Sequence, residues 1–419
     1  MNRLDRRTAL KFLGCLVLGG ATGCTVEDQS TKREAPAADM QQLAADNNAF
    51  AFDLYGTLRA SEGNLFLSPA STSTALAMTY AGAAGETEKQ MAKAMHFTLP
   101  EGKLHSAFAT LVRKLNGSGA DANQRGYQLS MANALWGQQG YTWKDEFLNV
   151  TRENYGAGLR EVDFAKATEQ ARQTINSWVE KQTNDKIKEL LKPGVLNSLT
   201  RLVLTNAIYF KGDWATQFDK KTTFDQDWHL AVDKKMKAPM MHRTGEFRLY
   251  DDRELQVLDL PYKGEELSMF VVLPRKVDGL AEVEKTVTAE KLTDWAKAMH
   301  SHDRVEVTLP KFKTTAEFVL NDELKKLGMT DAFGPEANFA RMNGNDRDLY
   351  IAAVVHKAFV DVNEEGTEAA AATGVVVATR AAPAQQHPVF RADHPFLFLI
   401  RDNRSGGVLF LGRLADPTK

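Results

Sequence analysis

Residues 364–382, with the sequence EEGTEAAAATGVVVATRAA, combine features that no single type of secondary structure explains. Four consecutive alanines favour a helix, yet Thr373, Gly374 and three valines follow them. If the segment is extended, alternate side chains lie on opposite faces. One face then carries only small, uncharged and often β-branched residues, namely Thr367, Ala369, Ala371, Thr373, Val375, Val377 and Thr379. Such a strand could enter the middle of a sheet without burying a charge on its inward face.

The length of this segment fits the same interpretation. A strand of thirteen residues spans roughly 40 Å at about 3.3 Å per residue, which is the length of a strand in a large sheet. The segment then ends at a single basic residue, Arg380. A flexible, alanine-rich surface loop is the alternative interpretation, and composition alone does not separate the two.

The residues before and after this segment predict an α+β fold. Helical patterns occupy residues 50–58, 70–84, 86–96, 103–114, 143–155 and 165–183. Strand-like runs occupy residues 127–136, 201–210, 267–273, 304–309, 349–362, 395–400 and 408–411. A block of helices followed mostly by strands is typical of α+β proteins and differs from the regular alternation of a doubly wound fold. Because no second linker interrupts these patterns, residues 46–419 are predicted to form one domain.

The first residues predict an export signal. Arg6 and Arg7 form a twin-arginine pattern, and a short apolar and glycine-rich run from Phe12 to Gly23 follows. Twelve helical residues span about 18 Å, well short of the bilayer core of roughly 30 Å. Residues 1–23 are therefore predicted to be a cleaved signal.

The end of that signal resembles a bacterial lipobox. Residues 21–24 read Ala-Thr-Gly-Cys, which predicts that Cys24 is lipidated and becomes the first residue of an exported protein in the cell envelope. Simple cleavage nearby, giving a soluble secreted protein, is the alternative. Residues 24–45 are polar and alanine-rich and predict a flexible tether.

Composition excludes several classes of protein. The 419 residues are 43% hydrophobic, which excludes a wholly disordered chain, and their formal net charge of −2 argues against a nucleic-acid-binding protein. Two cysteines cannot build a disulfide scaffold or a four-thiolate zinc site. The usual motifs of hydrolases, zinc proteases and nucleotide-binding enzymes are absent. We therefore predict no catalytic residues, no metal and no cofactor.

Several motifs in the same order resemble the serpin family. The stretch from Val360 to Arg380, and then Phe390 to Ile400 (FRADHPFLFLI), is similar to the hinge and C-terminal signature of serpins. Residues 64–71 (NLFLSPAS) resemble the segment called the shutter, and residues 205–214 (TNAIYFKGDW) resemble the central strand that ends at the breach tryptophan. The resemblance covers residues 46–419.

This resemblance implies a serpin fold with three β-sheets, eight or nine helices and an exposed reactive-centre loop at about residues 364–390. It also implies an irreversible suicide-substrate inhibitor of serine endopeptidases, held in a metastable native state. The protease cleaves the loop and forms an acyl-enzyme, and the cleaved loop then inserts into the central sheet and traps it. The nucleophile belongs to the protease, so the chain itself is not an enzyme.

The resemblance also assigns roles to individual residues. It places Arg380 and Ala381 on either side of the cleaved bond, and an arginine there implies a target of trypsin-like specificity. Cleavage after Ala378 by an elastase-like enzyme is the alternative. The implied hinge consists of Glu364, Glu365, Gly366, Thr367, Glu368, Ala369, Ala370, Ala371, Ala372 and Thr373. The implied shutter and breach residues are Ser68, Ser71, Asn206, His356 and Trp214, for which ordinary buried hydrogen bonding and plain core packing are the alternatives.

Three further functions stay open at this point. One is an enzyme with unfamiliar motifs, for which the sequence indicates no cluster of His, Asp or Glu residues. A non-inhibitory serpin could bind a ligand or act as a chaperone, although such members usually carry bulky, charged or proline residues in the hinge, unlike this chain. An inhibitor of cysteine proteases is also possible, since the trap works on any acyl-enzyme. We expect a monomer that contacts a membrane only through a lipid on Cys24.

Overall fold

The computed structural model describes residues 34–116, 126–156, 158–367 and 387–419, and the structural statements below concern these ranges. Residues 1–33, and with them the predicted export signal and Cys24, lie outside the described residues. The part from Ala35 to Lys419 is one unit. None of the described helices combines the length and the apolar character that crossing a bilayer requires.

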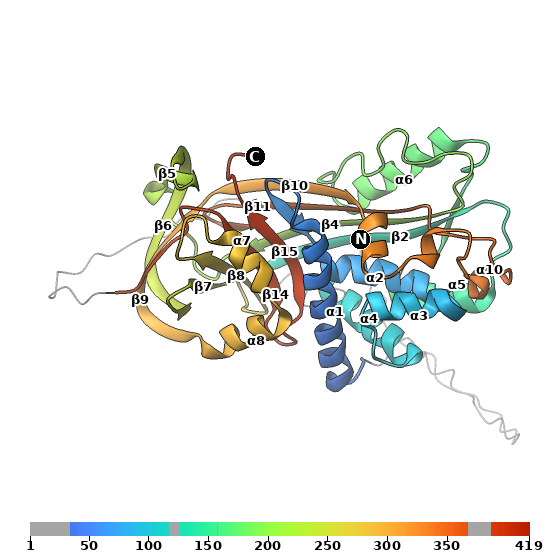
Figure 1. The fold of residues 1–419 in the computed structure, drawn as a ribbon, viewed down its shortest axis with the longest axis horizontal. Coiled ribbons are helices and arrows are strands. Elements are labelled where there is room, and N and C mark those ends of the chain that lie inside the picture. Colours follow the sequence, from blue (N-terminus) through green and yellow to red (C-terminus); the bar gives the residue numbers. More distant parts are fainter. Residues whose placement is uncertain (1–33, 117–125, 157, 368–386) are drawn as a thin grey trace, which may run out of the picture. The chain divides into compact units, whose positions relative to one another are not determined.

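Helices cluster early in the chain and strands dominate later, as expected for an α+β protein (Figure 1). The α-helices are α1 (Ala37–Leu58), α2 (Pro69–Tyr80), α3 (Gly85–Ala94), α4 (Glu101–Asn116), α5 (Asp145–Tyr155), α6 (Thr168–Gln182), α7 (Leu280–Thr286), α8 (Ala289–Ala298), α9 (Asn321–Lys326) and α10 (Ala340–Asn343). Two 3₁₀ turns cover Lys220–Thr222 and Asp331–Phe333. Among the described residues these ten helices exceed the expected eight or nine, because α10 is a single turn of four residues.

Fifteen strands are described. They are β1 (Leu65–Leu67), β2 (Tyr127–Gln138), β3 (Arg160–Val162), β4 (Leu202–Asp213), β5 (Phe224–Ala231), β6 (Lys234–Asp251), β7 (Leu255–Pro261), β8 (Leu267–Pro274), β9 (His300–Pro310), β10 (Phe312–Val319), β11 (Ala353–Val362), β12 (Gly366–Thr367), β13 (Val389–Arg391), β14 (Phe396–Asp402) and β15 (Val408–Leu414).

The strands of the described chain pair into two continuous sheets, where three were expected. A six-stranded sheet has the order β10-β11-β12-β4-β2-β3, and a nine-stranded sheet has the order β1-β15-β14-β8-β7-β6-β9-β13 with β5 on β6. The second sheet is continuous because β6 is 18 residues long and its pairing partners change along its length. Residues 234–240 of β6 pair with β5, residues 240–249 pair with β9, and residues 248–251 pair with β7.

The first helix begins inside the segment that was predicted to be a tether. Helix α1 starts at Ala37, so the prediction of a flexible tether over residues 24–45 is wrong for its last nine residues. Leu43 packs in the core, but the helical face is completed by buried polar residues that an apolar pattern cannot reveal. Asn47 accepts a hydrogen bond from Ser73 (2.6 Å), and Asn48 accepts one from the backbone of Val408 (2.7 Å). The folded unit thus begins before residue 46.

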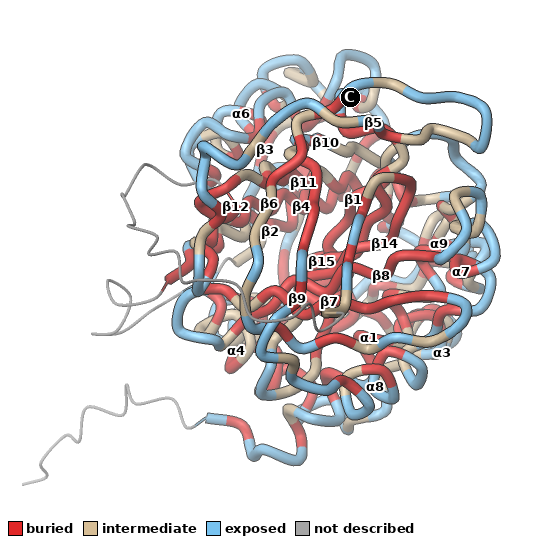
Figure 2. The backbone as a smooth tube through the Cα atoms, turned by 90° about the vertical axis from the view of Figure 1, so that its left-hand side faces the viewer, coloured by how far each residue is buried: buried red, intermediate tan, exposed pale blue. Residues whose placement is uncertain are grey.

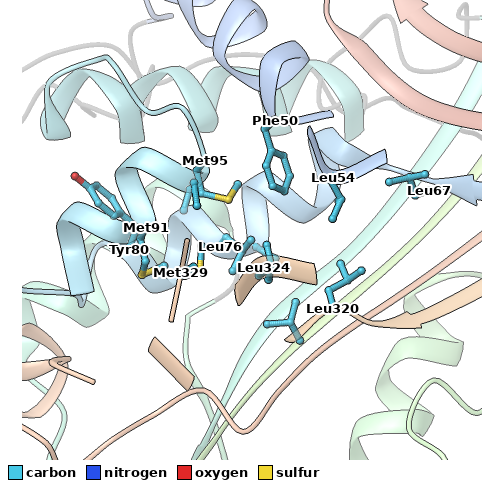
Figure 3. Close-up of a cluster of buried hydrophobic side chains, with 14 of the residues drawn as sticks. Phe50, Leu54, Leu67, Leu76, Tyr80, Met91, Met95, Leu320, Leu324 and Met329 are labelled. Atoms are coloured by element: carbon cyan, nitrogen blue, oxygen red, sulfur yellow. The ribbon is translucent and has the colours of Figure 1, made fainter. Parts of the chain in front are cut away.

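The six-stranded sheet is covered on both faces (Figure 1). Helix α6 packs on one face through Ile175 and Val179, and α2 lies on the other face with all twelve of its residues buried. Figure 2 shows that the buried segments run through the middle of the molecule and that exposed segments surround them. Figure 3 shows part of the core, where side chains of α1, α2, α3 and α9 meet.

Candidate functional site

The centre of the six-stranded sheet contains a short wedge between two parallel strands. Strands β11 and β4 pair directly from Ala353↔Val203 to Phe359↔Tyr209. Beyond this point β12 lies between them, with Thr367 paired to Gly212 of β4 and to Val362 of β11. Two hinge residues therefore already lie between one end of β4 and one end of β11, where a further strand could separate these two strands.

Gly366 is required by the close approach of this wedge to β4. Its φ angle of 154° lies in a region that residues with a side chain rarely adopt. A Cβ atom at this position would lie 2.0 Å from the carbonyl oxygen of Gly212 and 2.6 Å from the Cα atom of Asp213. Both contacts involve backbone atoms, so a larger residue would push β12 away from β4.

The two hinge glutamates are buried and paired with lysines. Glu364 lies 2.9 Å from Lys311, and Glu365 forms an ion pair with Lys220. Burial by itself would raise the pKa of Glu364, but its hydrogen bonds, above all the one from Lys311, outweigh burial and hold that pKa below its usual value. The Glu364 carboxylate is therefore stabilised in its charged form at neutral pH.

Trp214 and Tyr262 support the other side of the wedge. Their rings stack with centroids 4.7 Å apart. The indole Nε1 of Trp214 donates to the carbonyl oxygen of Asn363 (2.9 Å), and its backbone N–H donates to the carbonyl oxygen of Glu365 (2.9 Å). The Tyr262 hydroxyl lies 3.0 Å from Thr367 Oγ1, and burial raises the pKa of Tyr262, so the phenol stays protonated. Trp214 thus binds the hinge directly.

A second polar cluster lies under the strands, where α2 begins. Pro69 occupies the first position of α2, and Ser68 caps the helix by accepting a hydrogen bond from the backbone of Ser71 (3.2 Å). Asn206 of β4 donates to Ser71 Oγ and to Asn133 Oδ1. Ser71 also donates to Asn133 Oδ1 (3.0 Å), which joins α2 to β2 and β4.

His356 completes this cluster and links β11 to β4. The backbone N–H of Ser68 donates to His356 Nε2 (3.1 Å), so Nε2 accepts and carries no proton. The proton of the neutral ring therefore lies on Nδ1, which donates to Asn206 Oδ1. Burial lowers the pKa of His356 to about 3, which keeps the ring neutral. This hydrogen bond joins the two strands that the wedge separates further along.

The structure therefore divides the predicted site residues between two clusters. Ser68, Ser71, Asn206 and His356 lie together, as the resemblance implied, and Trp214 lies with the hinge residues. Glu364, Glu365, Gly366 and Thr367 are buried, so the prediction that they begin an exposed loop is wrong. They are buried because the wedge pairs with β4 and β11. Glu368 to Thr373, Arg380 and Ala381 lie outside the described residues.

Four residues of the two clusters were missed by sequence analysis. They are Asn133, Tyr262, Lys220 and Lys311. Asn133 offered a signal, since it is the one polar residue between two alanines in a strand-like run. The two lysines offered none, because their partners are distant in the sequence. Within the described ranges no group of three or more His, Cys, Asp or Glu side chains is arranged to hold a metal ion.

Comparisons with known proteins agree with this geometry. The family model described as Serpin (serine protease inhibitor) matches residues 45–417. The leukocyte elastase inhibitors of Sus scrofa and Homo sapiens are 45% and 44% identical to this chain, and each match covers 90% of this chain and 100% of the relative. The solved structure of uncleaved ovalbumin has a TM-score of 0.80 and 32% identity, covering 90% of this chain and 100% of that chain. With a family match of this extent, the chain belongs to the serpin family.

Proposed function

We propose that this serpin traps a serine protease that cleaves its reactive loop between Arg380 and Ala381. The family and its similar relatives, which are inhibitors of leukocyte elastase, support a protease-inhibitory serpin. The observation that carries the proposal is the two-residue wedge between β11 and β4, because it starts a strand that can lengthen.

The pairing of the wedge defines the register of the proposed insertion. Thr367 pairs with Gly212 and Val362, and both neighbours run antiparallel to it. If the pairing continues one residue at a time, Thr373 of the cleaved loop reaches Asn206 on one side and His356 on the other. Directly paired residues share a face of the sheet, so the Thr373 hydroxyl would take the place of the hydrogen bond between Asn206 and His356.

This register explains how the shutter can open without a large cost. An unpaired buried polar group costs about 1–3 kcal/mol. A hydroxyl both donates and accepts, so Thr373 can accept from His356 Nδ1 and donate to Asn206 Oδ1, which leaves neither group unpaired. The inward face of the hinge carries no charge on either side of that threonine. Insertion would therefore exchange one satisfied network for another.

The specificity of the proposed inhibitor follows from Arg380. A guanidinium pairs with the acidic pocket of trypsin-like proteases, so we infer a trypsin-like target. An elastase-like target is the second candidate, and the names of the relatives favour it. Such an enzyme prefers a small apolar residue and would cleave after Ala378, two residues before Arg380.

The decisive experiment compares trypsin and leukocyte elastase as targets of the full chain. We expect a trypsin complex that survives boiling in detergent, with mass spectrometry locating the cut after Arg380. Arg380→Ala should abolish the trypsin complex, and Ala378→Gly should leave it unchanged. Quantitative cleavage of the loop with fully active trypsin would contradict inhibition of trypsin, and a stable elastase complex cut after Ala378 would identify the second candidate.

A further inference from the structure

A buried histidine lies where three helices meet. His105 of α4 is 5% exposed, and its Nδ1 atom lies 2.6 Å from the hydroxyl oxygen of Tyr155 on α5. These two rings meet edge to face with centroids 5.8 Å apart, and the centroid of the Tyr80 ring on α2 lies 6.5 Å from that of His105. His105 therefore links α4 to α5 by a hydrogen bond and to α2 by packing.

The hydrogen bonds fix the position of the proton on the neutral His105 ring. Among the described residues, the Tyr155 hydroxyl has a single hydrogen-bond partner, Nδ1, and Nε2 of His105 has none. Burial raises the pKa of Tyr155, so its hydroxyl keeps its hydrogen. If Tyr155 donates to Nδ1, only the Nε2–H is unpaired, whereas the other tautomer leaves both the Tyr155 hydrogen and the Nε2 lone pair unpaired. Because unpaired buried groups are costly, Tyr155 donates and the ring proton lies on Nε2.

A carboxylate one helical turn before His105 forms a second link between helices. Glu101 Oε1 lies 3.9 Å from His105 Nε2, which is too far for a hydrogen bond, and 3.5 Å from the guanidinium of Arg341 on α10. Arg341 also pairs with Glu88 of α3 (2.9 Å). At neutral pH, α4 is thus linked to α5 through His105 and to α10 through Glu101.

The other ionisable groups around the ring leave it neutral at pH 7. Tyr80 and Tyr155 are uncharged phenols because burial raises their pKa, and Asp39 of α1 is paired with Lys103 of α4 (3.3 Å). Burial lowers the pKa of His105 to about 4, whereas a solvated histidine has a pKa of about 6.5. Acid therefore adds a proton to this ring, and it does so more readily when α4 is released.

A second proton on the ring weakens both links at once. It binds Nδ1, where it faces the hydrogen of the Tyr155 hydroxyl, so that hydroxyl must turn and its hydrogen loses its acceptor. The positive ring also attracts Glu101, which lies four residues earlier on the same helix, in competition with Arg341. Two contacts between helices are thus replaced by one ion pair within α4.

We propose that His105 and Glu101 form an acid-operated switch that holds the first two turns of α4 against α5 and α10 at neutral pH and releases them in acid. Helix α4 packs against β2, the strand that carries Asn133, and Asn133 binds Ser71 and Asn206 of the shutter. Release of α4 would therefore weaken the support of this strand. The switch goes beyond the proposed trapping of a protease and does not rest on it.

The test is hydrogen exchange of the full chain at pH 7.5 and pH 4.5, corrected for the intrinsic effect of pH on exchange. A pKa of about 4 in the closed helix and about 6.5 after release predicts that the opening constant of residues 101–108 rises roughly 70-fold in acid. Helix α8, which contains no histidine, is the internal reference and should change little. In His105→Gln the rise should be much smaller, because the amide oxygen can accept from Tyr155 and does not titrate. The control His300→Gln, at an exposed position, should behave as the wild type.

Three results would overturn the switch. They are a wild type in which residues 101–108 stay equally protected at both pH values, an equal rise in His105→Gln, and a rise in α8 as large as that of residues 101–108, which would indicate global unfolding. If His105→Gln does not fold, the ring resonances of the wild type replace it. The C2 proton of His105 should titrate together with the exchange of residues 101–108, and a protonated ring in a protected helix would contradict the proposal.

Discussion

The two polar clusters of the six-stranded sheet are built from different chemistry. The shutter around His356 consists of neutral groups, is fully buried and connects α2, β2, β4 and β11 through hydrogen bonds. The hinge base, which consists of Glu364, Glu365, Lys220 and Lys311, is charged. Its lysines are partly exposed even though its glutamates are buried. Neutral hydrogen bonds can be exchanged for others inside a protein, whereas ion pairs at a surface respond to salt and to charge substitution. The shutter is thus suited to re-forming around a new strand, and the hinge base is suited to holding the first two residues of that strand.

The largest effect is expected in the shutter, from His356→Leu. Leucine can neither accept the Ser68 N–H nor donate to Asn206, and each unpaired buried group costs about 1–3 kcal/mol, so the native state should lose about 2–6 kcal/mol. The urea midpoint of native unfolding measures this loss. His300→Leu, at an exposed position, is the control and should change little. An unchanged midpoint for His356→Leu would show that the network carries no stability.

At the hinge base, Gly366→Ala should have the next largest effect. The added methyl group would collide with the backbone of Gly212 and Asp213, so β12 should leave the sheet at a cost of about 1–3 kcal/mol. Hydrogen exchange should show faster exchange at residues 363–367, together with a lower melting temperature. Gly56→Ala is the control, because nothing lies within 4 Å of its added methyl. Normal protection of residues 363–367 in the alanine variant would contradict the role assigned to the wedge.

Lowering the pH should weaken the shutter in a predictable direction. The pKa of His356 is about 3 in the folded protein and about 6.5 in an unfolded chain, so only the unfolded state takes up a proton between these values. The contribution of His356 to stability is complete above pH 6.5 and falls as the pH decreases, by at most about 1.4 kcal/mol per unit. The stability difference between wild type and His356→Leu should therefore shrink from pH 7.5 to pH 5. A difference that grows in acid would reverse the assignment of a neutral ring.

The smallest effect is expected from Lys311→Gln, which removes the partner of Glu364. The melting temperature should fall slightly in 50 mM salt, and the deficit should shrink in 500 mM salt because exposed charges are screened. The control Lys313→Gln removes a more exposed ion pair with Asp361 and should have less effect. If the melting temperature falls equally at both salt concentrations, Lys311 stabilises the protein through packing and not through its charge.

The sequence predicted the shutter residues because a family resemblance placed them, and four of them proved to be in contact. It did not identify Asn133, which binds Ser71 and Asn206, although its place between two alanines was a signal. It could not predict that Lys220 and Lys311 pair with the hinge glutamates, because these partners are far apart in the chain. The start of α1 was missed for a related reason. Within residues 37–45 its inward face includes the buried Asp39, whose partner Lys103 is distant in the sequence.

The alternation of small residues after Glu365 is a local property, so the amino-acid sequence alone predicts that this segment is able to form a strand. Whether it is a strand before cleavage depends on the space between β4 and β11, and only the tertiary structure decided that Gly366 and Thr367 already fill its end. The physical reason is that a strand is stable only when neighbouring strands satisfy its backbone hydrogen bonds, and those neighbours come from distant parts of the chain.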